Sequence, residues 1–461
     1  MVQPARFRLD RPHTTKYATM IRSILATFAA MLPVSVVQST ARAIEPYEDN
    51  IKQNRETKLK KIAFFGHFNS SNFGNESTLQ TILYQLRRFH PDAEVVCIST
   101  GPEATVSTHQ IEAIPIAEFW SPKNPFLKVV RKVGIGVPDE LYRWTKCFLS
   151  LRHVDMFIIP GTGLLTDAYG LFEWGPYNMF KWSLMAKLCH CKLLFVSVGA
   201  GPIYRTLGRS FVKLALSLAD FRSYRDKSTM QYLEGIGFRT DNDQVSPDLA
   251  FSFPEVLIPK QDTKKGRKCV GLGLMEYAGR YSVFKPTNET YLLYLESLAR
   301  VVVWLLAHEY DVRLLSGDLG DVHVRQELKD LLRERLSMRD QAHIIDEPVL
   351  SVEDVLSHIA ATDIVVATRF HNILFAFLCN KPVISISFHH KCDSLMSAME
   401  LSKYCLDIND LKADRLIQTF CDLEANASKV KVKIRDKVDK FRATLDEQYK
   451  LIFGTDGLTN E

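Results

Sequence analysis

The chain has 461 residues, of which 46% are hydrophobic and 24% charged, and its formal net charge is +5. This length predicts a globular protein of two or three domains. The positive charge is dispersed, and no basic tract with interleaved aromatic residues follows residue 62, which argues against nucleic acid as a partner. Nine cysteines, mostly inside apolar runs, favour buried thiols in a reducing compartment over disulfides.

Residues 1–60 predict a basic, amphipathic segment followed by a charged linker. Within residues 20–43 an apolar run is interrupted by Pro33, and it is shorter than the roughly 20 residues of a bilayer span. The run is followed by Ala41-Arg42-Ala43, which has the form of a signal-peptide cleavage site. Two interpretations stay open: an amphipathic helix on a membrane surface, and a secretory signal peptide. The thiol usage favours the first, in a cytoplasmic protein peripheral to the inner face of the membrane.

Residues 61–255 predict a first α/β domain, in which strands and helices alternate. Three of its strands end in glycine-bearing loops, at Gly66, Gly161 and Gly199. The first loop has only Gly66 and Gly74, so the G-x-G-x-x-G fingerprint of dinucleotide-binding proteins is absent. Expected strands cover residues 61–66, 94–99, 155–160, 192–197, 221–226 and 245–251, expected helices cover 78–89, 207–219 and 228–235, and 101–150 form an irregular helical insertion.

Residues 268–410 predict a second α/β domain, which follows a polar linker at residues 254–268. Ser351 is the expected N-cap of one helix, because Glu353 and Asp354 follow in its first turn. Residues 411–461 predict a charged helical segment that packs back across both domains. Expected strands cover residues 269–274, 312–316, 343–346, 364–367 and 383–387, and expected helices cover 289–308, 321–336, 351–361 and 372–379.

The stretch from Asp363 to His390 predicts a strand, a helix and a second strand. Arg369 and His371 follow the first strand, and they point the same way if its extended geometry continues through Phe370. Open α/β sheets bind ligands at the carboxyl ends of their strands, where helix N-termini also attract anions. A cation and an imidazole at this place therefore indicate an anion-binding active site. The predicted fold class is α/β, with two doubly wound, Rossmann-like domains that face a cleft as in GT-B transferases.

Six motifs follow one another along the chain in a fixed order: FGHFNSSNFGNESTLQTIL, DMFIIPGTGLLTD, FVSVGAGPI, SYRDKST, SPDLAF and TRFHNILFAFLCNKPVISISFHHK. Together they resemble the motifs of the polysaccharide pyruvyl transferases, over residues 61–403. The last motif is the most specific, with Arg-x-His before a helix, then a strand and a lysine. One departure is that Pro247 precedes Asp248, where the family often has Asp before Pro.

The resemblance implies transfer of the enolpyruvyl unit of phosphoenolpyruvate to a sugar, with a pyruvate ketal bridging two hydroxyls and phosphate leaving. Arg225 and Arg369, one from each domain, are implied to hold the phosphate and carboxylate of the donor, because the planar fork of arginine suits both groups. His371 is implied to be the proton donor or relay for the methylene carbon. Lys391 is implied to add a further phosphate contact.

The implied acceptor is a sugar of a polysaccharide or of its lipid-linked precursor, with the first domain on the acceptor side and the second on the donor side. No cofactor is implied besides phosphoenolpyruvate as co-substrate. Cys189-His190-Cys191 and His389-His390-Lys391-Cys392 look metal-like, but no CxxC pair accompanies them. No D-x-D motif stands where a metal-dependent sugar-nucleotide enzyme would need one, so no metal site is predicted. The candidate partners of acceptor hydroxyls are Asn72, Asn75, Glu76 and Asp167.

Simpler interpretations stay open for single residues. Arg225 beside Asp226 also fits an exposed ion pair, and His371 also fits a helix cap. Lys391 also fits a solvated loop lysine, and Glu76 an ordinary carboxylate in a first helical turn. Two other functions stay open as well: a GT-B glycosyltransferase that uses a nucleotide sugar, and a non-catalytic glycan-binding member of the family.

Overall fold

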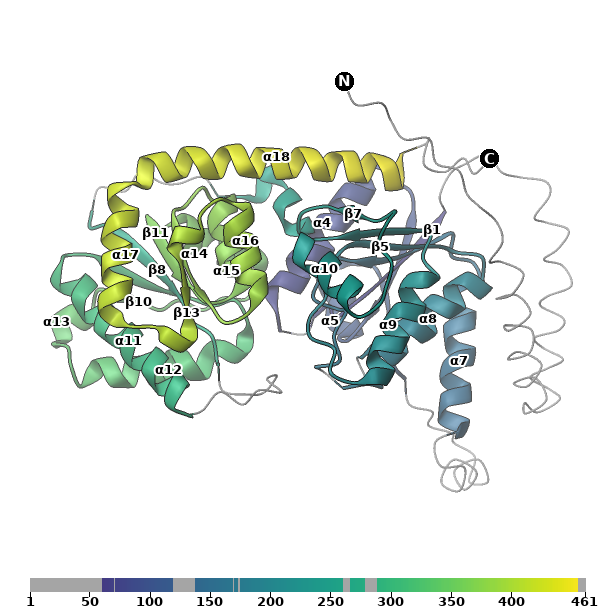
Figure 1. Ribbon diagram of the computed structural model, residues 1–461, viewed down its shortest axis with the longest axis horizontal. Helices are drawn as coiled ribbons and strands as arrows, with labels where there is room; N and C mark the ends of the chain where they lie inside the picture. The colour runs from purple at the N-terminus through teal and green to yellow at the C-terminus, as the bar shows by residue number, and fades with distance from the viewer. Residues whose placement is uncertain are drawn as a thin grey trace, which may run out of the picture. The chain divides into compact units, whose positions relative to one another are not determined.

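Two parallel β-sheets carry the described part of the chain, in a structure that is a computed structural model (Figure 1). The structure describes residues 60–69, 71–118, 137–168, 170–172, 175–259, 266–277 and 288–454. The predicted N-terminal segment lies outside these residues except for Lys60, so both interpretations of residues 20–43 stay predictions. Part of the predicted insertion, at 119–136, and part of the predicted linker, at 260–265, also lie outside them.

The first sheet has seven strands in the order β3-β2-β1-β4-β5-β6-β7, all paired in parallel. Alternate residues of β1 enter two separate apolar cores, since Ile62 and Phe64 belong to one core and Ala63 and Phe65 to the other. The strands are β1 (Lys61–Gly66), β2 (Glu94–Ser99), β3 (Glu112–Pro115), β4 (Met156–Pro160), β5 (Lys192–Val198), β6 (Phe221–Tyr224) and β7 (Gln244–Val245). The helices are α4 (Phe73–Phe89), α5 (Pro102–His109), α7 (Val137–Leu151), α8 (Pro176–Leu188), α9 (Thr206–Ser217) and α10 (Lys227–Gly235).

The second sheet has six strands in the order β10-β9-β8-β11-β12-β13, again all parallel. Ser351 caps α14 in a capping box with Asp354, as the sequence predicts. The strands are β8 (Cys269–Gly273), β9 (Asp311–Leu315), β10 (Ile344–Ile345), β11 (Ile364–Ala367), β12 (Val383–Ser387) and β13 (Cys405–Asp407). The helices are α11 (Asn288–Ala307), α12 (Val322–Arg333), α13 (Met338–Gln341), α14 (Val352–Ala360), α15 (Phe370–Leu378), α16 (His390–Ala398) and α17 (Ala413–Ala425).

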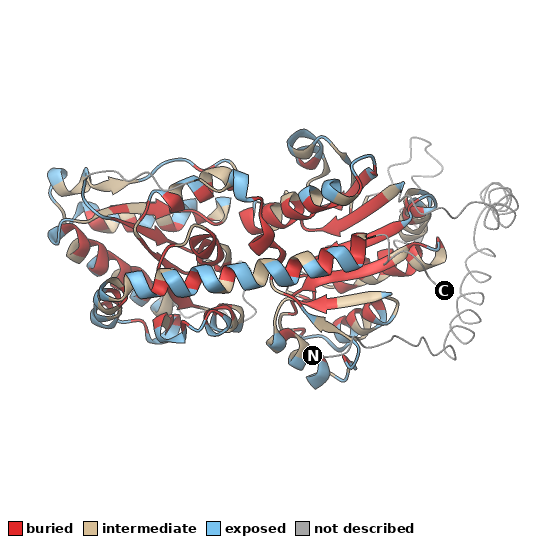
Figure 2. Ribbon diagram, turned by 90° about the horizontal axis from the view of Figure 1, so that it is seen from above, coloured by how far each residue is buried: buried red, intermediate tan, exposed pale blue. Residues whose placement is uncertain are grey.

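The last helix, α18 (Ala427–Phe453), contacts elements of both sheets, as predicted for the C-terminal segment (Figure 1). Gln448 donates from Nε2 to Ser197 Oγ at the end of β5, at 3.1 Å, and Lys437 pairs with Glu400 after α16, at 2.6 Å. Its buried residues recur along the side that faces the rest of the protein (Figure 2). One apolar core continues from the first sheet through α18 into the second, so the two sheets share a packed interior.

Four sequence expectations need correction. The strand expected at residues 245–251 ends at Val245, and Asp248 caps a short 3-10 helix, Leu249–Ser252. The irregular region 101–150 contains the outer strand β3, which is partly exposed and so lacks a buried apolar run. Helix α8 was not expected, because its buried side chains surround it and leave no amphipathic pattern. Helix α4 begins at Phe73 and not at residue 78.

All of α11 except its first residue, Glu289–Ala307, is long and apolar enough to cross a membrane. Half of that window is buried inside the protein, where the helix packs against β9, α12 and α17. A core helix of a globular domain has these properties too, so this helix carries no membrane assignment.

Candidate active site

Three cations lie just beyond strand ends and next to helix N-termini. Arg225 follows β6 and precedes α10, Arg369 follows β11 and precedes α15, and Lys391 lies in the first turn of α16 after β12. Helix α15 has no acidic residue in its first turn and no side-chain cap, so no side chain satisfies its first N–H groups. The partial positive charges of the helix ends therefore add to the charges of the side chains.

Arg225 is buried beneath the loop that follows β5. Its side chain is 7% exposed, Nη1 lies 3.7 Å from Asp248 Oδ2, and Nε lies 3.5 Å from Asp226 Oδ2. Nε makes no hydrogen bond with any described residue. The backbone of Gly199 lies so close that a Cβ there would be 2.5 Å from Nε. The exposed surface ion pair that the sequence left open is therefore excluded, because this guanidinium is buried and incompletely paired.

Lys391 lies on the same aromatic ring as Arg225. Its Nζ is 5.9 Å from the ring centroid of Phe370, and the Arg225 guanidinium carbon is 4.9 Å from that centroid. A second ring, Phe388, lies 5.0 Å from Nζ. No carboxylate of the described residues forms an ion pair with Lys391. Burial, with the charges of Arg225 and Arg369, lowers the pKa of Lys391 to about 8.

His371 packs against the start of α4 in the first-sheet half of the protein. A Cβ on Gly74 would lie 1.8 Å from Nδ1, so only glycine fits beneath this ring. Nε2 is buried and has no hydrogen-bond partner among the described residues. Burial, followed by the charges of Lys391, Arg225 and Arg369, lowers the pKa of His371 to about 3. The imidazole is therefore neutral in this state and surrounded by positive charge.

The prediction that Arg369 and His371 share one extended backbone is wrong. Arg369 is the extended N-cap residue, and α15 begins at Phe370, so His371 occupies the first helical turn. Arg369 instead turns to the fully buried Asp321, which accepts from Nε at 3.0 Å and from Nη2 at 2.5 Å. Against the effect of burial, the Asp321 carboxylate raises the pKa of Arg369. Only Nη1 of this guanidinium is left outside the carboxylate fork.

The predicted acceptor residues of α4 are engaged within the protein. Asn72 caps the helix, because its Oδ1 accepts from Gly74 N at 3.0 Å, and its Nδ2 donates to Asp318 Oδ2 at 3.1 Å. Asn75 donates from Nδ2 to the carbonyl of His67, at 3.0 Å. Both side chains therefore shape the loop before α4.

Glu76 and Asp167 are also paired, and they belong to separate networks. Glu76 accepts from the N–H of Asn69 and lies 3.3 Å from His109 Nε2. Asp167 is 1% exposed and accepts from the backbone N–H groups of Tyr204 and Arg205, at 2.9 and 2.8 Å. It therefore fixes the chain at the start of α9. No hydrogen bond or ion pair among the described residues joins Asp167 to Glu76.

Several residues around the cations escaped the sequence analysis. Asp321 and Asp318 follow β9. Their position in a loop after a strand of the second domain is the sequence feature that could have identified them as site residues. Asn372 is fully buried, and both atoms of its amide lack a partner among the described residues. His389 caps α16, since its Nδ1 accepts from Lys391 N at 3.3 Å. The first histidine of the HHKC motif therefore has a role as a helix cap. Among the described residues, no three His, Cys, Asp or Glu side chains lie close enough together to hold a metal ion.

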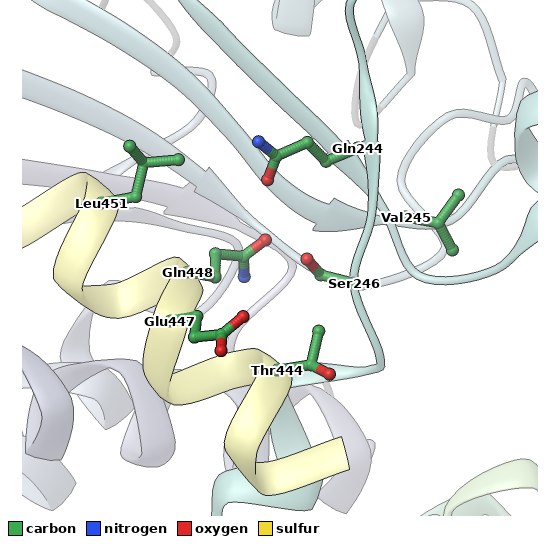
Figure 3. A pocket seen from close by; sticks show the side chains of 7 residues that line it. All are labelled: Gln244, Val245, Ser246, Thr444, Glu447, Gln448 and Leu451. Atoms are coloured by element: carbon green, nitrogen blue, oxygen red, sulfur yellow. The ribbon is translucent and has the colours of Figure 1, made fainter. Parts of the chain in front are cut away.

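A separate cavity of about 400 Å³ lies between β7 and α18 (Figure 3). None of the predicted donor residues lines it. Its lining consists of Gln244, Val245, Ser246, Thr444, Glu447, Gln448 and Leu451, with no cation among them. The candidate active site is therefore defined by the unpaired nitrogen atoms around His371 and not by this cavity.

Comparison with known proteins gives a family and a fold. The family model for polysaccharide pyruvyl transferase matches residues 72–390, more than half of the chain. A glycosyltransferase from Rickettsia africae is 16% identical, with 86% of this chain and 99% of that chain covered and a TM-score of 0.51. MnaA of S. aureus with UDP is 13% identical, with 87% and 98% covered and a TM-score of 0.55. UDP-GlcNAc 2-epimerase of Neisseria meningitidis, bound to UDP-GlcNAc, is 11% identical, with 84% and 100% covered and a TM-score of 0.51. These likenesses confirm the predicted two-domain, GT-B-like α/β fold.

Proposed function

Because the chain belongs to the polysaccharide pyruvyl transferase family, we propose that it moves the enolpyruvyl unit of phosphoenolpyruvate onto a saccharide. The observation that supports this most is the set of Arg225, Lys391 and His371, in which incompletely paired cations surround a neutral imidazole. Buried polar atoms without partners are rare in folded proteins, and a ligand with phosphate and carboxylate oxygens would supply the missing acceptors.

The donor is held by charge and by directed N–H groups. Arg225 offers an Nε without a hydrogen bond, Lys391 offers an ammonium group that forms no ion pair with a carboxylate, and the first turn of α15 offers backbone N–H groups. Arg369 contributes the positive charge and the Nη1 atom that its pairing with Asp321 leaves. In this proposal Arg225 and Lys391 are the primary anion ligands, and Arg369 is a secondary one.

His371 handles the proton in this proposal. The negative charges of a bound donor oppose the cations that lower the pKa of His371, so donor binding raises this pKa and lets the imidazole carry a proton. The methylene carbon of the donor gains a proton, and C2 forms a bond with one sugar oxygen, which loses its proton. A second hydroxyl of the sugar then bonds to C2, the C2–O bond to phosphate breaks, and inorganic phosphate leaves with the proton of that hydroxyl.

The acceptor in this proposal is a saccharide, free or lipid-linked, that approaches from the side of α4. Gly74 of α4 lies against the His371 ring, and this contact supports an acceptor that reaches His371 from the first-sheet half of the protein. We place the reaction in the cytoplasm, with residues 1–60 as the contact to a membrane surface.

The test is incubation of the purified protein with phosphoenolpyruvate and a panel of candidate saccharides. The proposal expects release of inorganic phosphate that depends on the acceptor, together with a ketal in the product by NMR. Release of a nucleoside diphosphate from a sugar nucleotide, without any use of phosphoenolpyruvate, would contradict it and favour a glycosyltransferase.

A further inference from the structure

The loop Gly317–Asp321, here called the β9 loop, contacts both halves of the protein. On one side, Asp321 holds the guanidinium of Arg369, and Asp318 Oδ2 lies 3.9 Å from its Nη1. On the other side, Asp318 accepts from Ser71 Oγ and from Asn72 Nδ2, each at 3.1 Å. The β9 loop thus joins a donor-side arginine to the residues that begin α4.

Backbone hydrogen bonds reinforce this junction. Phe73 N donates to the carbonyl of Gly317 at 3.3 Å, and Leu319 N donates to the carbonyl of Ser71 at 3.0 Å. Asn72 and Asp318 form an isolated antiparallel bridge. Ser71 has a φ of 73°, a conformation that non-glycine residues rarely adopt, so these contacts hold a strained residue in place.

The same segment continues directly beneath His371. Asn72 uses both ends of its amide, since Nδ2 donates to Asp318 and Oδ1 accepts from Gly74 N. Gly74 in turn packs against the imidazole at a distance that excludes any side chain. A continuous chain of contacts therefore runs from Asp318 through Asn72 and Gly74 to His371.

We propose that Asp318 is a positioning residue, which fixes the start of α4 against His371 and so sets where the imidazole meets the donor. This inference rests on the proposed function and adds a residue that acts without touching substrate. Its carboxylate makes a third hydrogen bond, from Gly320 N at 2.9 Å, so the loop that carries it is itself held rigidly. Without the carboxylate, the Asn72 amide loses its partner and the first turn of α4 is free to shift.

The main experiment compares kcat and KM for phosphoenolpyruvate in Asp318→Ala, Asp318→Asn and a matched control, Asp330→Ala. A displacement of about 1 Å near reacting groups costs up to roughly 100-fold, so we expect kcat of Asp318→Ala to fall about 10- to 100-fold. Asp318→Asn keeps one acceptor oxygen and should recover part of this loss. Asp330 is exposed on α12 and accepts hydrogen bonds only from Gln326 and Arg333 among the described residues, so its variant should keep wild-type kinetics.

A double-variant cycle separates positioning from a general loss of stability. If Asp318 acts through Asn72, the double variant Asp318→Ala, Asn72→Ala should lose no more kcat than the worse single variant. Losses that multiply, or a lower unfolding midpoint with unchanged kcat, would overturn the proposal.

Histidine NMR keeps the test independent of turnover. In ¹⁵N-labelled protein without donor, Asp318→Ala should move the His371 imidazole signals, whereas Asp330→Ala should not. Unmoved His371 signals in Asp318→Ala would refute the positioning role even if the protein proved to have another activity. Moved signals in a protein that never consumes phosphoenolpyruvate would support the positioning role and refute the proposed function.

Discussion

The donor-side cations and the predicted acceptor residues use their polar atoms in opposite ways. On the donor side, Arg225 Nε and His371 Nε2 are buried without hydrogen-bond partners among the described residues, and Lys391 forms no ion pair with a carboxylate there. On the acceptor side, Glu76 and Asp167 accept from backbone N–H groups. Because folded proteins pair nearly all buried polar atoms, the unpaired set indicates a ligand site, and the paired set indicates architecture.

The charges around His371 also differ from those around the predicted acceptor residues. Burial, followed by the like charges of Lys391, Arg225 and Arg369, lowers the pKa of His371 and holds the imidazole neutral. Under the proposed function, a donor with several negative charges offsets these positive charges, so we expect donor binding and proton uptake by His371 to be coupled. The acceptor-side carboxylates gain nothing comparable from a neutral sugar, since their hydrogen bonds are already made within the protein.

The largest expected effect comes from His371→Ala. Loss of a positioned proton carrier should lower kcat by about 100- to 10,000-fold, measured as acceptor-dependent phosphate release. His323→Ala, an exposed histidine of α12, is the control and should keep full activity. Equal rates in the two variants would show that His371 takes no part in the reaction. The contrast between residues with and without hydrogen-bond partners would then no longer indicate the active site.

Lys391→Met should have the next largest effect. A hydrogen bond to a charged group contributes ~1.5–3 kcal/mol, so kcat/KM for phosphoenolpyruvate should fall about 10- to 100-fold. The same variant should unfold at a higher temperature without donor, because it removes an unpaired cation from a cationic site. Lys440→Met, on the exposed side of α18, should change neither quantity. If Lys391→Met has both a lower kcat/KM and a lower unfolding temperature than the wild type, Lys391 has an acidic partner in solution, which would contradict this prediction.

The pH dependence should show activity and stability moving in opposite directions. Burial lowers the pKa of Lys391 to about 8, so its charge is present below that pH and lost above it. The kcat/KM for phosphoenolpyruvate should therefore fall above about pH 8. An unfolded lysine has a pKa of ~10.4, so between these values the unfolded state binds more protons and stability contributed by Lys391 rises with pH. Lys391→Met should show neither the fall of kcat/KM above about pH 8 nor the rise of stability with pH. If either pH effect persists in that variant, another group causes it.

The sequence predicted the strand ends better than the partners at those ends. The βαβ stretch around Arg369, the glycine-bearing loops and the Ser351 cap depend on local patterns, and the structure confirms them. The partners could not be predicted in the same way. Asp321, which is 48 positions from Arg369, meets it only because β9, β8 and β11 are neighbours in the second sheet. The order of the strands and the directions of the side chains belong to the tertiary structure, and a local sequence pattern does not determine them.

The prediction of acceptor-binding residues was also limited by what a local sequence pattern contains. Polar residues such as Asn72 and Glu76 in a loop after a strand look like ligand contacts in a sequence, because substrate-binding and loop-building residues have the same composition. Only the hydrogen bonds distinguish them: Asn72 is the cap of α4, and Glu76 holds the loop at Asn69. The site prediction was therefore strongest where cations stood at strand ends and weakest where amides and carboxylates stood in loops.

The smallest expected effect on catalysis comes from Asp167→Asn, which tests the architectural side of the comparison. One carboxylate oxygen becomes an NH2 group that faces the backbone N–H of Tyr204 or of Arg205, so one of the two buried acceptors is lost and unfolding should become easier by ~1–3 kcal/mol. We expect kcat and the KM for the acceptor to stay within about threefold at a temperature where the variant is folded, since changes away from the reacting groups leave transition-state contacts intact. Thermal unfolding and steady-state kinetics on one preparation give both numbers, with Asp330→Asn as the exposed control. An acceptor KM raised tenfold or more with unchanged stability would return Asp167 to the binding site, and the division between paired and unpaired residues would then fail as a guide to function.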